Sequence, residues 1–177
     1  MKNLFLLTVV FCGAFALKSN AKLSRTLSDV GRWGNPIYAL GLSTAEKDNE
    51  GTIQLFISAI GAQIASETLK KITKEKRPDY TDGAPRNSFP SGHAVGAFSG
   101  AMFIHKRYGL QYAVVPYLFA AYTGFERVDS KRHHLHDVLA GAAVSALFTW
   151  GFVSKYNDKF TFAVDEDSVR LQYKTKL

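Results

Sequence analysis

Two long stretches of the sequence combine helical length with small side chains, and they limit the fold that this chain can adopt. One is 91–107, and the other runs from Leu139 to Trp150 within the longer segment His133–Tyr156. Small side chains let neighbouring helices approach closely, so both stretches predict tightly packed helices. The small residues of the first stretch are Gly92, Ala94, Gly96, Ala97, Ser99, Gly100 and Ala101.

Apolar residues recur with helical spacing in several other segments. Two short helices are predicted at Leu23–Trp33 and Ile37–Ala45, with Gly34-Asn35-Pro36 as a break between them. A long helix is predicted at Thr52–Lys74 and another at Leu110–Phe125. The long helix has an apolar side, which consists of Ile53, Phe56, Ile57, Ile60, Ile64 and Leu69.

The remaining segments are a predicted loop and a C-terminal tail. The segment 77–91 is rich in proline and contains Asp82-Gly83, so it predicts a loop. In the tail, apolar and polar residues alternate on both sides of Asp165–Ser168, which predicts a two-stranded hairpin, with a loose polar tail as the alternative. We therefore expect an all-α fold, a compact bundle of about five to six helices, with a short C-terminal β-hairpin.

The N-terminus indicates a compartment. Lys2 precedes a short apolar run, Leu4–Leu17, and Ser19-Asn20-Ala21 places small residues where a signal peptidase cleaves. We predict a signal peptide at 1–21 and one domain at 22–177, with an uncleaved membrane anchor as the alternative. Cleavage would remove Cys12, the only cysteine, so the exported protein would have no disulfide.

The apolar cores of the predicted helices are shorter than the roughly 20 residues that a membrane span needs. This length favours a compact bundle in the periplasm over an integral membrane protein, while contact with the membrane surface stays open. The formal net charge of +7 favours anionic partners. No nucleic-acid-reading motif is present, so we expect phosphate-bearing partners instead of nucleic acid.

Three polar clusters lie at predicted helix ends. In Arg127-x5-His133-x3-Asp137, the four-residue spacing lets the carboxylate reach the imidazole on one helix face, and the arginine can hold an anion. Alone, this pattern also fits a polar helix start. In Pro90-Ser91-Gly92-His93, a helix N-cap offers free N–H groups to phosphate, with a histidine beside them to move a proton.

The remaining cluster is Lys70-x6-Arg77-Pro78, which alone would be ordinary positive charge at a helix C-terminus. In an antiparallel bundle, all three helix ends can converge on one pocket. Two histidines, three cations and a helix N-terminus would form a phosphoryl-transfer site that needs no metal and no cofactor. His134 and His136 are expected to be bystanders, because adjacent histidines on a helix point about 100° apart.

In order and spacing, the three clusters resemble the signature of the type 2 phosphatidic acid phosphatase superfamily. That superfamily includes lipid phosphate phosphatases, bacterial acid phosphatases and vanadium haloperoxidases. The resemblance implies that His133 attacks phosphorus, Asp137 orients it, and His93 protonates the leaving group. It also implies a phosphate-binding set, which consists of Lys70, Arg77, Ser91, Gly92 and Arg127.

One position departs from the pattern of that superfamily. Its third motif usually begins Ser-Arg, whereas this chain has Glu126-Arg127. A carboxylate beside a phosphate clamp would repel the substrate, so we expect Glu126 to point away or to pair with a nearby base.

The hypothesis from the sequence is an exported, metal-independent phosphatase that acts on phosphate monoesters or pyrophosphates through a phosphohistidine. A lipid-linked substrate is favoured, because apolar helices with small residues could offer a groove to a lipid tail. The alternatives are a soluble non-specific acid phosphatase, a phosphotransferase and a vanadate-dependent haloperoxidase.

Overall fold

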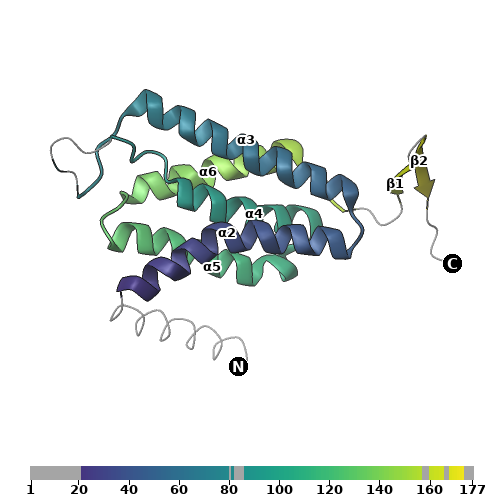
Figure 1. Cartoon of the computed structure of the whole chain (residues 1–177), viewed down its shortest axis with the longest axis horizontal. Coiled ribbons are helices and arrows are strands. Elements are labelled where there is room, and N and C mark those ends of the chain that lie inside the picture. The colour runs from purple at the N-terminus through teal and green to yellow at the C-terminus, as the bar shows by residue number, and fades with distance from the viewer. Residues whose placement is uncertain (1–20, 80, 82–85, 157–159, 166–167, 174–177) are drawn as a thin grey trace.

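A computed structural model describes residues 21–79, 81, 86–156, 160–165 and 168–173 of the chain. Its described part contains five helices followed by a two-stranded hairpin (Figure 1). The expected all-α bundle is therefore confirmed, whereas the predicted signal peptide lies outside the described residues except for Ala21. The elements are α2 (Ala21–Ala45), α3 (Asn49–Thr73), α4 (Gly92–Tyr108), α5 (Leu110–Asp129), α6 (Leu135–Phe152), β1 (Phe160–Asp165) and β2 (Ser168–Tyr173).

Helix α4 is the central element of the bundle. It packs against each of the other four helices (Figure 1). Most of its side chains are buried, and its small residues allow the neighbouring backbones to come close. A Cβ atom at Gly100 would lie only 2.4 Å from the backbone carbon of Asn35, so α2 and α4 touch backbone to backbone there.

The predicted break at 34–36 is wrong, because α2 continues through Pro36 without interruption. Two contacts to other helices hold this segment in place. The side-chain nitrogen Nδ2 of Asn35 donates to the carbonyl oxygens of Ala97 and Pro116, both at 2.9 Å. An internal proline costs a helix about 3 kcal/mol, and here the hydrogen bonds that Asn35 donates to α4 and α5 offset part of that cost.

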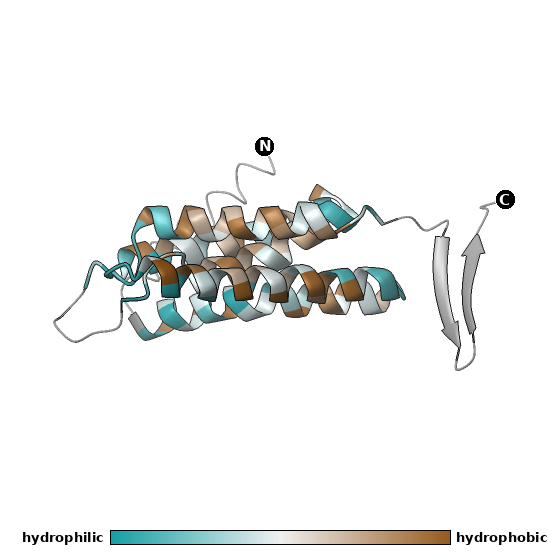
Figure 2. Cartoon of the chain, turned by 90° about the horizontal axis from the view of Figure 1, so that it is seen from above, coloured by the Kyte–Doolittle hydropathy of each residue, from teal (hydrophilic) through white to brown (hydrophobic). Residues whose placement is uncertain are grey.

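The apolar side of α3 faces outward. Ile53 is 60% exposed and Ile64 is 62% exposed, whereas the buried positions of the helix are small or polar except for Leu55. Figure 2 shows hydrophobic residues along the length of the helices and hydrophilic ones mostly near their ends. Large apolar side chains are also exposed on the other outer helices, among them Trp33, Ile37, Val115, Phe119, Leu139, Leu147 and Trp150.

The core of the bundle thus consists mostly of small and polar side chains, with Phe103 and Ile104 as its largest apolar members. The exposed apolar side chains on the outer helices are called the apolar surface below. Water-soluble monomers rarely expose large apolar side chains contiguously over the outside of a domain. Among the described helices, Leu135–Phe152 is long and apolar enough to cross a membrane, with a mean hydropathy of 1.3.

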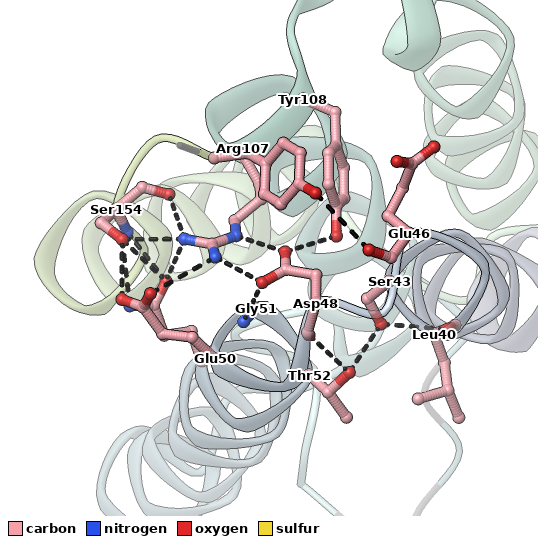
Figure 3. A network of polar contacts seen from close by, with 12 residues as sticks. Leu40, Ser43, Glu46, Asp48, Glu50, Gly51, Thr52, Arg107, Tyr108 and Ser154 are labelled. Carbon is pink, nitrogen blue, oxygen red and sulfur yellow. Dashed lines mark hydrogen bonds and ion pairs between the residues drawn. The ribbon is translucent and has the colours of Figure 1, made fainter. Parts of the chain in front are cut away.

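A buried ion pair joins the start of α3 to the end of α4 (Figure 3). The guanidinium of Arg107, at the end of α4, donates to both carboxylate oxygens of Asp48, at 2.6 and 2.5 Å. Both side chains are only 3% exposed. Burial alone would raise the pKa of Asp48, but hydrogen bonds from Arg107, the amide of Gly51 and Tyr108 outweigh it and lower that pKa.

The predicted C-terminal hairpin is present. Strands β1 and β2 pair antiparallel, with Phe160 opposite Tyr173 and Val164 opposite Val169. The alternation of apolar and polar residues in the sequence therefore marks both strands correctly.

Candidate active site

The three sequence clusters lie at one end of the bundle. Lys70 is in the last turn of α3, Ser91 is the N-cap of α4, and Arg127 lies near the end of α5. Because these helices alternate in direction, the ends that carry the clusters meet beside the loop 74–91 (Figure 1). The convergence expected from an antiparallel bundle is therefore observed.

His133 and Asp137 form a buried pair. Nδ1 of His133 lies 3.5 Å from Oδ2 of Asp137, and the two side chains are 4% and 0% exposed. His133 precedes α6, which begins at Leu135, so the two residues do not share a helix face as the spacing suggested. Instead, Oδ2 of Asp137 accepts a hydrogen bond from the amide of His134 at 2.8 Å, which folds the preceding residues over the carboxylate.

Ser88 completes this pair, and the sequence analysis missed it. Its hydroxyl donates to Oδ2 of Asp137 at 2.5 Å and lies 3.5 Å from Nδ1 of His133. The carboxylate is thereby fixed on the Nδ1 side of the imidazole. The imidazole is therefore held at Nδ1, and Nε2 is the ring nitrogen that does not face the carboxylate. Ser88 lies in the loop, where no spacing rule connects it with a residue 49 positions away.

Ser91 is the N-cap of α4, as the sequence predicts. The Ser91 side chain is fully buried and accepts the amide of Ala94, and the Ser91 amide donates to the carbonyl of Asp137 at 2.9 Å. A Cβ atom at Gly92 would lie 3.0 Å from Nζ of Lys70, so a glycine here lets the ammonium approach the helix start. Glu67 accepts a hydrogen bond from Lys70 at 2.6 Å.

His93 lies between a carboxylate and a guanidinium. Its Nε2 is 2.9 Å from Oδ1 of Asp29 on α2 and 3.4 Å from a terminal nitrogen of Arg127. Burial and the positive charge of Arg127 lower the pKa of His93 to about 4, against the opposing effect of the Asp29 hydrogen bond. Asp29 was not foreseen, because it stands 64 residues from His93 on a separate helix.

Arg127 is held by its own neighbour. Oε2 of Glu126 accepts a hydrogen bond from Nε of Arg127 at 2.6 Å, and Glu126 is only 3% exposed. The expectation that Glu126 pairs with a nearby base is thus confirmed. The backbone carbonyl of Arg127 also accepts the amides of Arg132 and His133, both at 3.0 Å, which ties this residue to the loop that carries the nucleophile candidate.

The side chain of Arg77 contacts the loop that precedes α4. Its Nε donates to the side-chain oxygen of Asn87 at 3.1 Å, next to Ser88 in the chain. A cavity of about 490 Å³ opens on the same side, between the end of α3 and the loop. Its lining is mostly basic and consists of Glu67, Lys70, Lys71, Lys74, Arg86 and Asn87.

A second, apolar groove lies between α2, α3 and α4. It has a volume of about 330 Å³ and is lined by Trp33, Ile37, Phe56 and Ile60 among others. Gln63 also lines it, and this side chain reaches to 3.4 Å from the Cβ position of Gly92. Gln63 therefore links the lining of the groove to the start of α4.

The family model of the PAP2 superfamily matches residues 51–161, and the chain belongs to this superfamily. The match covers α3 to α6 and therefore every cluster residue from Lys70 to Asp137. Asp29 lies outside it.

Two relatives are lipid A phosphatases. The chain is 45% identical over 69 residues to Lipid A 1-phosphatase of Porphyromonas gingivalis, a match that covers 37% of this chain and only 16% of that protein. It is 29% identical over 175 residues to Lipid A 4'-phosphatase of Helicobacter pylori, covering 90% of this chain and 85% of that protein. The crystal structure of Aquifex aeolicus LpxE has the same fold, with a TM-score of 0.61 and 21% identity over 73% of this chain and 82% of that one.

Proposed function

We propose that this protein is a phosphatase that removes phosphate from a lipid-linked substrate, with His133 as the nucleophile. The observation that carries the proposal is the buried His133–Asp137 pair beside the start of α4, where Lys70 lies over Gly92. A histidine with a fixed tautomer, a cationic side chain and free helix amides are the groups that phosphoryl transfer without a metal requires.

In the proposed reaction, Nε2 of His133 attacks phosphorus and the bond to the leaving oxygen breaks, which yields a phosphohistidine and an alcohol. His93 gives its proton to the leaving oxygen. His93 then takes a proton from water, which attacks the phosphohistidine and releases inorganic phosphate. Lys70, Arg77 and Arg127, with Ser91 and the amide of Gly92, hold the phosphate oxygens.

The low pKa of His93 fits a proton donor that acts only when substrate is bound. Without substrate, burial and the adjacent Arg127 keep the imidazole neutral by lowering its pKa. A phosphate placed between Arg127 and His93 brings negative charge that offsets the arginine, so the imidazole gains a proton as the substrate binds.

A lipid-linked substrate is supported by two features. Gln63 lines the apolar groove and its side chain approaches Gly92, so an acyl chain in the groove would bring a headgroup phosphate towards the start of α4. The apolar surface is suited to contact with lipid tails, and we propose that the protein lies in or against a bilayer. Since two relatives are named for lipid A, a phosphorylated glycolipid of that kind is the substrate that we propose.

The proposed location is the outer side of the cytoplasmic membrane, following export directed by residues 1–21. Of the alternative functions, a soluble non-specific acid phosphatase is the least compatible with the apolar surface. The phosphotransferase and haloperoxidase alternatives use the same pocket and differ in the acceptor or co-substrate that is supplied.

The test is phosphate release by the purified protein in detergent and EDTA, with lipid A and p-nitrophenyl phosphate as substrates. The proposal predicts metal-independent release, faster from the lipid, with inhibition by vanadate. His133→Ala should abolish release, while His105→Gln, at the far end of α4, should keep it. Activity that requires a divalent metal, or that prefers the soluble ester strongly, would contradict the proposal.

A further inference from the structure

Three metal-ligating side chains converge on the side of Asp137 that faces away from His133. Glu75 follows α3, and His136 and Asp137 stand in the first turn of α6. Nε2 of His136 is 2.6 Å from Oε1 of Glu75 and 3.2 Å from Oδ1 of Asp137. One donor atom from each residue lies within 4.8 Å of the others.

The second carboxylate oxygen of Asp137 points into this cluster. Oδ2 of Asp137 accepts hydrogen bonds from Ser88 and from the amide of His134, whereas Oδ1 is buried and accepts none. Leaving a buried carboxylate oxygen without a donor is costly, and native proteins rarely do so. Oδ1 is therefore an unused, fully buried ligand atom aimed at Nε2 of His136.

We propose that Glu75, His136 and Asp137 form a binding site for a divalent transition metal, with Zn²⁺ as the best fit. Imidazole nitrogen and carboxylate oxygen are both zinc ligands, with ligand distances of about 2.0–2.2 Å, and three protein ligands leave a fourth position for water. Ligands of a tetrahedral zinc ion lie roughly 3.3–3.5 Å apart by this geometry. The 3.2 Å separation already fits, and the 2.6 Å separation has to widen by less than about 1 Å.

The movable ligands make this adjustment feasible. The side chains of His136 and Glu75 are 57% and 32% exposed, so each can shift without repacking the core. Asp137 stays fixed by Ser88 and the His134 amide, so it provides the rigid ligand.

Metal at this site would inhibit the proposed phosphatase reaction. This inhibitory role rests on the proposed function, whereas the binding site itself does not. The ion would bind Oδ1 of the same carboxylate whose Oδ2 faces His133. Its positive charge would neutralise the carboxylate, which then stabilises the positive charge on the attacking imidazole less well. The site therefore predicts reversible inhibition by zinc that leaves the phosphate-binding residues untouched.

The binding test uses the full chain with Cys12→Ser, so that no thiol competes for the ion. Zinc is titrated against a chromogenic chelator, with Mg²⁺ as a comparison because it prefers six oxygen ligands. We expect one zinc ion per chain, bound at least about tenfold more weakly in Glu75→Gln and in His136→Gln. His105→Gln should bind as tightly as the parent. Failure to bind zinc, or equal binding in all variants, would overturn the site.

The activity test separates the site from its effect. Zinc should slow phosphate release by the parent, EDTA should restore it, and His136→Gln should keep its basal rate in the presence of zinc. Zinc that binds through Glu75 and His136 but leaves the rate of the parent unchanged would overturn the inhibitory role. Because binding is measured without substrate, it still tests the site if the protein proves not to be a phosphatase.

Discussion

The carboxylate of Glu126 holds the guanidinium of Arg127, the next residue in the chain, with Oε2 2.6 Å from Nε. The terminal nitrogen Nη1 of Arg127 lies on the side of His93, 3.4 Å from its Nε2. A carboxylate that would repel a phosphate from within the pocket is thus buried behind the arginine and fixes its direction. The departure from the usual Ser-Arg pattern has a structural reason.

Glu126→Ala should therefore raise KM for the phosphorylated substrate by about tenfold, because a charge-assisted hydrogen bond contributes about 1.5–3 kcal/mol and 1.4 kcal/mol is a factor of ten. In Glu126→Gln, which keeps an oxygen acceptor for Nε of Arg127, KM should rise less. Steady-state kinetics in detergent measures both. If KM stays the same in Glu126→Ala, then Glu126 does not position Arg127.

The pKa of His93 should move in opposite directions in two variants. Arg127→Gln removes a positive charge that lowers this pKa, so the pKa should rise above about 4. Asp29→Asn removes a carboxylate that raises it, so the pKa should fall below that value. Titration of the labelled imidazole by NMR checks both signs, and a shift of the same sign in both variants would contradict the described geometry.

The Arg107–Asp48 pair should be essential for stability and irrelevant to substrate affinity. Arg107→Leu leaves the buried carboxylate of Asp48 without its partner, which should cost about 3–5 kcal/mol in the free energy of unfolding. Glu50→Ala is the matched control, because Glu50 is 41% exposed and 3.6 Å from Arg107, so its loss should cost less than about 1 kcal/mol.

Thermal unfolding in detergent measures the difference between these variants. Adding Asp48→Asn to Arg107→Leu should recover part of the lost stability, since the buried charge is then gone. Equal melting temperatures for Arg107→Leu and Glu50→Ala would show that the pair does not stabilise the bundle.

The close approach of α2 and α4 predicts a contrast between two glycines. A Cβ atom at Gly100 would lie 2.5 Å from the backbone nitrogen of Pro36, so Gly100→Ala should force the helices apart and lower the melting temperature by several degrees. At Gly41 a Cβ atom meets nothing within 4 Å, so Gly41→Ala should be neutral or stabilising. A stable Gly100→Ala variant would contradict the backbone contact.

The sequence was sufficient to predict the four helices from α3 to α6, the hairpin and the convergence of the three clusters. These features follow from the spacing of apolar and small residues that lie close together in the sequence. It could not predict that α2 continues through Pro36, because the stabilising hydrogen bonds of Asn35 reach residues 62 and 81 positions away. It showed that α3 has an apolar side, but not that this side faces outward.

The residues that support His93 and Asp137 likewise could not be predicted from the sequence. Ser88 and Asp29 act across 49 and 64 residues, and no spacing rule links them to Asp137 or His93. Glu75 approaches His136 only because the loop after α3 folds back against α6. Such contacts depend on the tertiary fold, whereas the three clusters show themselves by residue type and spacing.

The most direct test of this account is detection of a phosphoryl group on His133. The protein is mixed with substrate, quenched in alkali, in which phosphohistidine survives, and analysed by mass spectrometry. The account predicts substrate-dependent phosphorylation of His133, and none in His133→Ala, which should release no phosphate. Phosphorylation of another residue, or phosphate release by His133→Ala at the rate of the parent, would contradict it.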